Sequence, residues 1–177
     1  AALKSSPQEI SDEQILNLLQ DKNRVEPGFR LLMSKYQERL YWHIRRMVGE
    51  HDDANDVMQN CMIKVFRSIK GFQRKSQLYT WLYRIATNEA ITFLKKKKRK
   101  ATTSMDDEEI NLANRLPADT QVDGDLAQRI LQEAVIRLPE KQRMVFQLRY
   151  FEEMSYREMS EALDTSEGAL KASYTTL

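Results

Sequence analysis

The chain has 177 residues, of which 41% are hydrophobic and 31% are charged, with 5 Gly and 4 Pro. This length allows one medium domain or two small ones, and the apolar content is sufficient for a core. So few Gly and Pro residues argue against an all-β protein with many tight turns. Long stretches rich in Leu, Lys, Glu, Gln, Met and Arg favour helices, so we predict an all-α fold.

The net charge is only +2, but the charges are unevenly distributed. Lys and Arg outnumber Asp and Glu by 17 to 6 in residues 27–100, whereas Asp and Glu outnumber them by 7 to 1 in residues 101–125. A basic block before an acidic segment indicates a domain that faces a polyanion, followed by a linker. Nucleic acid is therefore a candidate partner, although Lys-rich helices also serve simply to keep a protein soluble.

The cysteine and hydropathy patterns bear on the compartment. A single cysteine, Cys61, excludes an internal disulfide and favours a reducing compartment. No stretch of the sequence approaches the roughly 20 apolar residues that a membrane span needs. The N-terminus does not resemble a signal peptide. We expect a cytoplasmic protein without membrane insertion.

The first predicted helix begins after a loose tail at residues 1–10. Ser11 can cap this helix with its side-chain oxygen, and Gln14 can complete a capping box. A longer helix is predicted from Pro27, because apolar residues then recur at steps of three and four for about five turns. Gly49 is the candidate C-cap of this second helix.

The next two predicted helices are separated by a basic loop. One helix spans about 53–69, and Gly71 ends it. The polar, aperiodic segment 72–77 is predicted to be a loop. The other helix spans 78–94, with apolar residues spaced by four, and continues into six consecutive cations at 95–100. Cations suit the last turn of a helix, but six exceed what capping requires.

Residues 101–124 change in character, because apolar residues become sparse and Thr, Ser, Asn and acids dominate. This composition predicts a linker. Its acidic patch at 106–109 could shield the basic run within the chain or enter a basic channel on a partner, although solvation of a tether is the simpler interpretation. Apolar residues at helical spacing return over 126–138 and end at Pro139, which is suited to begin the next helix.

These elements predict four segments. Residues 1–26 form an N-terminal tail and short helix. Residues 27–100 and 125–177 form two helical domains, and a flexible acidic linker at 101–124 joins them.

The C-terminal segment contains a helix-turn-helix candidate. Ser155 and Glu158 predict a capping box for a short helix ending near residue 163, and Ser166 caps a last helix after a three-residue turn. In this motif the second helix enters the major groove with its N-terminal residues near the base edges. The residues so placed are Ser166, Glu167, Ala169, Lys171, Ala172 and Thr175. Other helical hairpins share this pattern, so the pattern by itself does not distinguish DNA binding from a structural hairpin.

Aromatic and basic residues alternate in the loop and helix at 72–88. The aromatic residues are Phe72, Tyr79, Trp81 and Tyr83, and the cations are Arg74, Lys75 and Arg84. Aromatic faces stack on unpaired bases, and cations hold the phosphates. Trp81 borders the apolar stripe, whereas Tyr79 and Tyr83 are predicted to lie off it, beside Thr80 and Thr87. The alternative is an aromatic-rich core helix with a few exposed rings.

Little in the sequence supports catalysis or a metal site. His43 and His51 stand eight positions apart with no nearby Cys, so we do not expect a zinc site. We place His43 at the boundary of an apolar helix face. Asp52, Asp53 and Asp56 fall at a helix N-terminus, where acids are stabilised without a metal. The sequence has no phosphate-binding Gly-rich loop and no nucleophile elbow, so we expect neither an enzyme nor a cofactor.

Two separate motifs resemble those of extracytoplasmic-function sigma factors, a group of the sigma-70 family. Residues 52–66 resemble their region 2.2, and residues 71–88, which contain the run TWLYRIA, resemble region 2.3. The run at 138–143 resembles the LPxxxR opening of region 4, with the helix-turn-helix behind it. The resemblance covers roughly residues 28–174 and implies two helical domains that direct bacterial core RNA polymerase to promoters and help to open the minus-10 element.

The resemblance also implies three binding surfaces. Core polymerase would bind the helix at 53–69 through Asp53, Asp56, Val57, Gln59, Met62 and Phe66. Single-stranded minus-10 DNA would bind Phe72, Arg74, Lys75, Ser76, Tyr79, Thr80, Trp81, Tyr83, Arg84 and Asn88, with a flipped base captured by the loop at 72–77. The last helix would read duplex minus-35 DNA through the six residues given above. An anti-sigma factor is implied as a further partner by family habit alone.

The sequence departs from the family at two places. Asn55 and Asn60 stand where acids are usual, which softens the polymerase-binding face. The last helix lacks the Arg-rich turns with which family members usually continue, and fewer cations weaken phosphate contacts. Either the chain is truncated there, or the minus-35 element is bound more weakly or read differently.

Two other functions fit parts of the sequence. A stand-alone helix-turn-helix regulator would use the N-terminal helices to bind a ligand or to dimerise. A regulatory protein could instead bind polymerase without reading promoters. The aromatic-basic loop and the basic run argue against the first, because a reader of duplex DNA needs neither.

Overall fold

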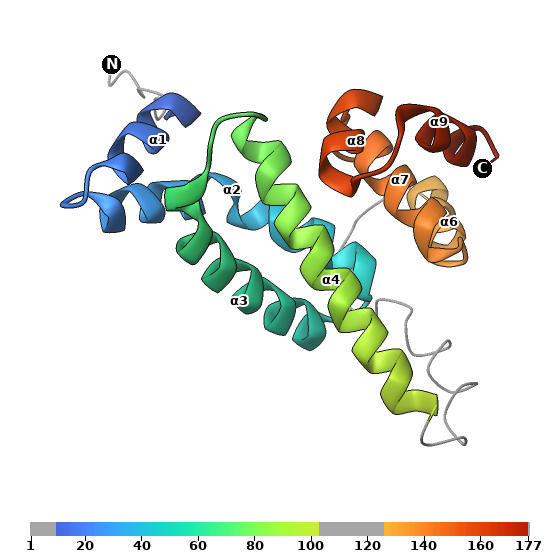
Figure 1. Cartoon of the computed structure of the whole chain (residues 1–177). Helices are drawn as coiled ribbons and strands as arrows, with labels where there is room; N and C mark the ends of the chain where they lie inside the picture. The colour runs from blue at the N-terminus through green and yellow to red at the C-terminus, as the bar shows by residue number, and fades with distance from the viewer. Residues whose placement is uncertain (1–9, 103–125, 177) are drawn as a thin grey trace, which may run out of the picture.

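The computed structural model describes residues 10–102 and 126–176, and every regular element within these ranges is a helix (Figure 1). The all-α prediction is therefore confirmed. The predicted tail as far as residue 9, and the predicted linker with its acidic patch from residue 103 onward, lie outside the described residues.

The N-terminal unit begins with α1 (Asp12–Gln20) and α2 (Val25–Val48). Ser11 and Gln14 form the predicted capping box of α1, each side chain accepting a hydrogen bond from the other residue's backbone N–H. The second helix starts two residues before Pro27. It ends at Gly49, whose φ of 88° is favourable for glycine and satisfies the predicted C-cap.

Two further helices complete this unit. The helix α3 (His51–Ser68) continues into a single 3₁₀ turn, η1 (Ile69–Gly71), and α4 (Leu78–Thr102) follows the predicted loop. Leu78, Leu82, Ala86 and Ala90 are buried along one face of α4, as their spacing of four predicts. The predicted basic run is the last part of α4, so the cations are displayed from a helix.

The C-terminal unit consists of α6 (Leu126–Ile136), α7 (Glu140–Tyr150), α8 (Tyr156–Leu163) and α9 (Glu167–Thr175). Pro139 is the N-cap of α7 rather than its first helical residue. The capping box of Ser155 with Glu158 and the N-cap at Ser166 both form as predicted. On α6 the predicted apolar face is buried only in part, because Leu126 and Ile130 are 70% and 59% exposed.

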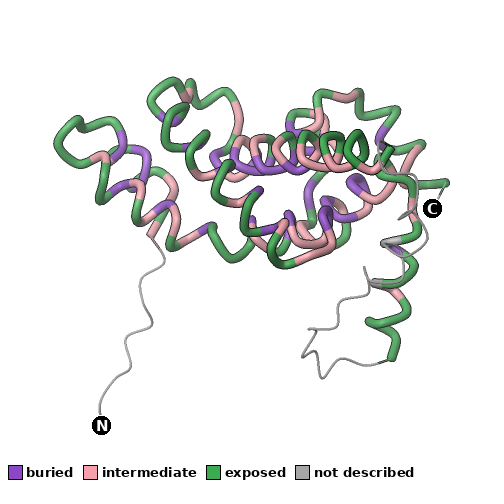
Figure 2. Tube along the Cα trace, turned by 90° about the horizontal axis from the view of Figure 1, so that it is seen from below, coloured by how far each residue is buried: buried purple, intermediate pink, exposed green. Residues whose placement is uncertain are grey.

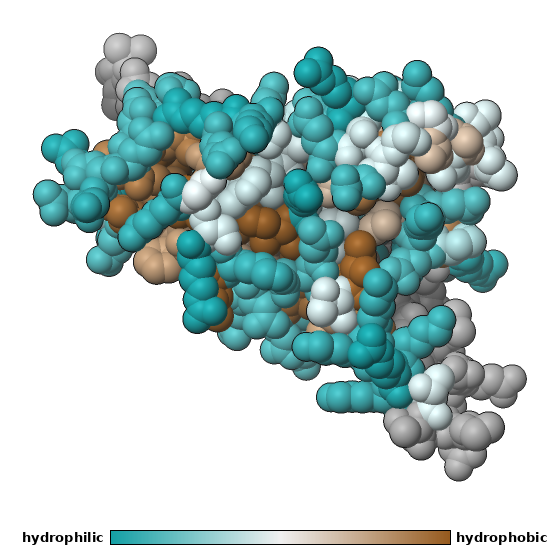
Figure 3. All heavy atoms as spheres, viewed as in Figure 1, coloured by the Kyte–Doolittle hydropathy of each residue, from teal (hydrophilic) through white to brown (hydrophobic). Residues whose placement is uncertain are grey.

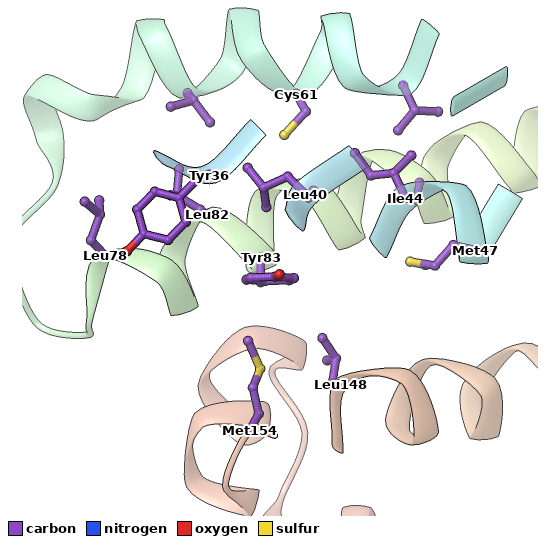
Figure 4. Packing of buried hydrophobic residues seen from close by; sticks show 14 of the residues in the cluster. Tyr36, Leu40, Ile44, Met47, Cys61, Leu78, Leu82, Tyr83, Leu148 and Met154 are labelled. Atoms are coloured by element: carbon purple, nitrogen blue, oxygen red, sulfur yellow. The ribbon is translucent and has the colours of Figure 1, made fainter. Parts of the chain in front are cut away.

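The two units pack together, with α8 beside the N-terminal half of α4 and α7 near α2 (Figure 1). Buried positions lie along the facing sides of the helices in both units (Figure 2). Leu148 and Met154 of the C-terminal unit belong to the same buried cluster as Leu82 and Tyr83 of α4 (Figure 4).

His43 was predicted at the boundary of an apolar helix face, and this placement is wrong. The structure buries it completely, with Nε2 2.9 Å from the Thr87 hydroxyl of α4. Its ring also packs edge to face on Tyr83, with centroids 5.0 Å apart. Periodicity on a single helix could not reveal that a second helix covers this position.

Candidate nucleic-acid interface

The basic loop at 72–77 is held in place by the first helix of the chain. Arg74 donates hydrogen bonds to Glu13 at 2.5 Å and to Asn17 at 3.5 Å, both on α1. Arg74 also has a positive φ of 56°, which a non-glycine residue adopts at some free-energy cost. The salt bridge with Glu13 helps to offset that cost. Sequence reasoning missed this contribution of α1 because 61 residues separate the two partners.

The exposed side of the predicted minus-10 surface carries rings and polar groups. Phe72 and Trp81 pack on each other with centroids 5.2 Å apart, and both are half-buried. Arg84 and Asn88 follow along α4 and are exposed, as are Arg74 and Lys75 in the loop. The arrangement can offer stacking surfaces beside cations, which is what single-stranded nucleic acid requires.

The other side of that surface is covered by the C-terminal unit, contrary to the predicted placement of Tyr83 off the apolar stripe. Tyr83 is fully buried and Thr80 is 1% exposed, whereas Thr87, also buried, is bonded to His43 of α2. Figure 4 shows the Tyr83 ring between the N-terminal helices and Met154. The hydroxyl of the neighbouring Tyr79 donates a hydrogen bond to Glu158 of α8.

A buried carboxylate, that of Glu152, stands at the centre of this junction. It follows α7 and is only 7% exposed. It accepts hydrogen bonds from Tyr83 Oη at 2.5 Å, Arg46 Nη2 at 3.3 Å and Arg39 Nη2 at 3.4 Å. Burial and the hydrogen bond to Glu152 both raise the pKa of Tyr83, which keeps its hydroxyl protonated as the donor.

Neither Glu152 nor its two arginine partners are among the residues predicted from the sequence to bind DNA or polymerase. The spacing of Arg39 and Arg46 could have indicated a shared helix face, because residues seven apart lie two turns from each other. No local pattern marks Glu152, since its partners are 69 to 113 positions away.

Several polar atoms near the junction are buried without a hydrogen-bond partner among the described residues. They are Thr80 Oγ1, Arg46 Nε and His43 Nδ1. An unsatisfied buried polar group costs about 1–3 kcal/mol. These unmet polar groups therefore offset part of the stabilisation that the charged contacts give the junction.

A polar cleft of about 450 Å³ lies where the loop meets α8. Arg74, Lys75 and Thr80 line it from the N-terminal unit, and Arg157, Glu158 and Glu161 line it from α8. Its charges are mixed, because Arg74 pairs with Glu13 and Arg157 pairs with Glu161. The predicted loop residue Ser76 also faces this cleft and is half-buried.

The predicted polymerase-binding residues divide into two groups on α3. Asp56, Gln59 and Phe66 are exposed and Met62 is half-buried, and Phe66 packs edge to face on Phe29 with centroids 5.2 Å apart. Val57 is in the core at 1% exposure, and the Asp53 carboxylate accepts a hydrogen bond from Lys97 at 2.7 Å. The structure thus presents the first group outward and turns Val57 inward.

The predicted minus-35 residues all lie on the outside of the helix-turn-helix. Each is exposed on α9 or at its N-cap: Ser166, Glu167, Ala169, Lys171, Ala172 and Thr175. Leu170 of the same helix is buried and fixes the helix against its neighbours. The Lys171 ammonium lies 5.5 Å from the centre of the Tyr156 ring of α8, which links the two helices of the motif.

The cations at the end of α4 form a hydrophilic tip, visible as teal atoms at the lower right of Figure 3. Lys97 pairs with Asp53 of α3 and with Glu50, the N-cap of that helix. Among residues 10–102 and 126–176, no three His, Cys, Asp or Glu side chains gather as a candidate metal site. No helix in these same ranges is long and apolar enough to cross a membrane.

Two solved structures share this fold. A sigma factor RpoE in complex with the anti-sigma factor NepR from Bartonella quintana superposes with a TM-score of 0.70 at 20% identity, covering 84% of this chain and 90% of that one. CnrH in complex with the cytosolic domain of CnrY gives a TM-score of 0.65 at 17% identity, covering 93% and 90%.

Sequence comparison extends the likeness to characterised relatives. The ECF RNA polymerase sigma factor SigW of Bacillus subtilis is 30% identical over 86% of each chain. The ECF RNA polymerase sigma-E factor of Haemophilus influenzae is 29% identical over 93% of this chain and 90% of its own. These matches span both units, so they support the sigma factor interpretation and not a stand-alone regulator.

The family regions coincide with the two units of the structure. Sigma-70 region 2 matches residues 32–100, and Sigma-70 region 4 matches residues 128–175. The first range carries the aromatic-basic surface, and the second carries the helix-turn-helix. The chain therefore belongs to the extracytoplasmic-function sigma factors of the sigma-70 family, transcription initiation factors that bind core RNA polymerase and direct it to promoters.

Proposed function

We propose that the three surfaces predicted from the sequence divide the work of promoter recognition. The observation that carries the proposal is the placement of α9, whose six predicted contact residues are all exposed. A recognition helix must present its N-terminal residues to base edges in the major groove. This helix, in region 4, would read the minus-35 element as duplex DNA.

The loop at 72–77 and α4 would bind the non-template strand of the minus-10 element. Phe72 and Trp81 supply rings, and Arg74, Lys75 and Arg84 supply cations. Tyr79, Thr80 and Tyr83 would join this surface only when α8 moves away from α4, because α8 and the segment before it cover them.

The exposed part of α3 would bind core RNA polymerase. Asp56, Gln59, Met62 and Phe66 combine an acid with apolar side chains on the outside of one helix. A mixture of this kind suits a protein partner better than a nucleic acid, whose phosphates would repel the acid.

Three further properties belong to this proposal. The chain would act in the cytoplasm as a binding protein, without catalysis of its own. An anti-sigma factor would regulate it, which is supported by the structural relative RpoE, solved in complex with the anti-sigma factor NepR. The predicted domain boundaries at 27 and 125 are likewise proposed, and the family matches at 32–100 and 128–175 lie inside them.

Gel filtration of the chain with bacterial core RNA polymerase tests the proposal. Co-elution is expected, together with preference of the resulting holoenzyme for promoter DNA with an unpaired minus-10 strand. Binding of duplex DNA by the chain alone, without co-elution, would contradict the proposed polymerase surface on α3.

A further inference from the structure

Three side chains of region 2 surround a single anionic group in this structure. Arg39 and Arg46 lie two turns apart on α2, and Tyr83 comes from α4. Their donors converge on the Glu152 carboxylate at 2.5 to 3.4 Å. Two guanidinium groups and a hydroxyl around one carboxylate make a built anion site with one excess positive charge.

The group that fills this site comes from region 4. The ring of Phe151, next to Glu152, packs on the Arg46 guanidinium, with 4.3 Å between Cζ and the ring centre. Both residues lie between α7 and α8 and move with region 4. Their departure would leave two cations and the Tyr83 hydroxyl on the surface of region 2 without their present partners.

We propose that Arg39, Arg46 and the Tyr83 hydroxyl bind a backbone phosphate of promoter DNA, and that Glu152 occupies this phosphate site until region 4 moves away. The inference rests on the proposed role of α4 in minus-10 binding. It adds to that role Arg39 and Arg46 of α2, which are outside the predicted DNA-binding residues.

The position of the site favours DNA over a protein acid as its ligand. Tyr83 is one helical turn from Tyr79 and directly precedes Arg84, so the site is continuous with the proposed minus-10 surface. Tyr79 is itself bonded to a second acid of region 4, Glu158. Carboxylates of region 4 thus bond to two tyrosines that lie one turn apart on α4, the helix that is proposed to face DNA phosphates.

The test uses the full chain and a short fluorescein-labelled oligothymidylate, which presents phosphates without a specific sequence. Glu152→Gln keeps the side-chain size and removes the competing charge. Glu153→Gln is the matched control, because Glu153 is adjacent and exposed. Fluorescence anisotropy at low salt should show about a tenfold gain in affinity for Glu152→Gln, as expected when the competent state becomes the main one, and no gain for Glu153→Gln.

The arginines are then changed in the Glu152→Gln background. Arg39→Gln or Arg46→Gln should each reverse most of the gain and reduce the slope of log affinity against log salt by about 0.7, the value for one phosphate of a single strand. Equal affinities of Glu152→Gln and Glu153→Gln would overturn the proposal. So would a gain that persists after both arginines are changed, since Glu152 would then act only by general repulsion.

Two additional arms separate the remaining explanations. If oligoglutamate of equal charge competes as strongly as the oligonucleotide, the site binds protein carboxylates and the DNA assignment is wrong. Trp81→Ala in the same assay tests the proposed function independently. Loss of binding with Trp81→Ala but not with Arg46→Gln would retain the minus-10 role and reject the phosphate site, and the reverse result would retain the site and reject the stacking role.

Discussion

His43 illustrates how one buried side chain connects the helices of region 2. Its Nε2 pairs with Thr87, its ring contacts Tyr83, and Nδ1 has no partner among the described residues. Complete burial and the nearby Arg46 charge lower its pKa from 6.5 to about 3. The neutral imidazole is therefore the form compatible with the folded chain.

This shift predicts a pH dependence of stability. The unfolded chain takes up a proton on His43 near pH 6.5, whereas the folded chain resists protonation down to about pH 3. The contribution of the neutral His43 to the free energy of unfolding is complete above pH 6.5. It is lost as the pH falls, by at most about 1.4 kcal/mol per pH unit. Urea unfolding of wild type and His43→Gln should give free energies whose difference shrinks over this window. A constant difference would show that His43 does not cause the dependence.

Trp81 and Tyr83 are neighbours in sequence with different surroundings. Trp81 is half-buried against Phe72, whereas Tyr83 is fully enclosed and bonded to Glu152. Trp81→Ala should therefore impair promoter opening more than polymerase binding, because stacking contributes about 1–3 kcal/mol per base. Permanganate reactivity of the minus-10 strand measures opening, and gel filtration measures polymerase binding.

Tyr83 needs a milder change than alanine. Tyr83→Ala would empty core volume at a cost of about 3–5 kcal/mol, as for other large aromatic deletions. Tyr83→Phe removes only the hydroxyl and should leave the chain helical by circular dichroism.

For the Trp81→Ala variant, an equal loss of promoter opening and of polymerase binding would contradict the stacking role. It would indicate that the Trp81 ring is a core element.

At the scale of elements, the ends of the helices are specified by local chemistry. Ser11, Ser155 and Ser166 each cap a helix with the side-chain oxygen, and Gly49 ends α2 in the left-handed region. The short turn at Gly49 sends α3 back along α2. Because α3 packs against α2 with one face, its opposite face stays exposed to solvent.

Two glycine substitutions should have opposite effects on stability. Gly49→Ala places a side chain at φ 88° and should destabilise the chain by about 1–2 kcal/mol. Gly168 lies within α9, where an added Cβ meets nothing within 4 Å. Gly168→Ala should stabilise that helix by about 0.5–1 kcal/mol. Thermal unfolding of both variants checks the signs, and a stabilising Gly49→Ala would contradict the role of the cap.

At the scale of the whole molecule, the packing of the two units leaves some of the proposed surfaces exposed and covers others. The exposed residues of α3 and the α9 face are open to partners. The Tyr79 and Tyr83 side of α4 is covered by the segment around α8. On the proposed assignment, polymerase binding and minus-35 reading would begin in this arrangement, whereas full minus-10 binding would require separation of the two units.

The α3 surface gives a prediction at this scale. Asp56→Ala combined with Phe66→Ala should weaken core polymerase binding by about tenfold or more, because the truncation of central interface residues commonly removes over 1 kcal/mol each. The variant should stay helical, since both side chains are exposed. Gln73→Ala, an exposed loop change outside the predicted sets, serves as control. Unchanged affinity of the double variant would move the polymerase surface elsewhere.

The sequence by itself determined the helical class, the caps at Ser11, Gly49, Ser155 and Ser166, and the two family regions. These features depend on local physics: apolar residues at helical spacing, side-chain oxygens near free backbone N–H groups, and a glycine at a left-handed turn. The helix-turn-helix followed in the same way, because Ser155, Glu158 and Ser166 act on backbone groups within three positions.

Only the tertiary structure decided which faces are covered. The burial of His43 and Tyr83, the support of Arg74 by α1 and the anion site around Glu152 all join residues 44 to 113 positions apart. Side-chain periodicity shows which face of a helix is apolar, but it does not identify the elements that pack on the other faces. It therefore cannot distinguish a solvent-exposed face from one that a second unit buries. That choice depends on the packing of α7 and α8 on α2 and α4, which brings an acid from region 4 onto the cations of region 2.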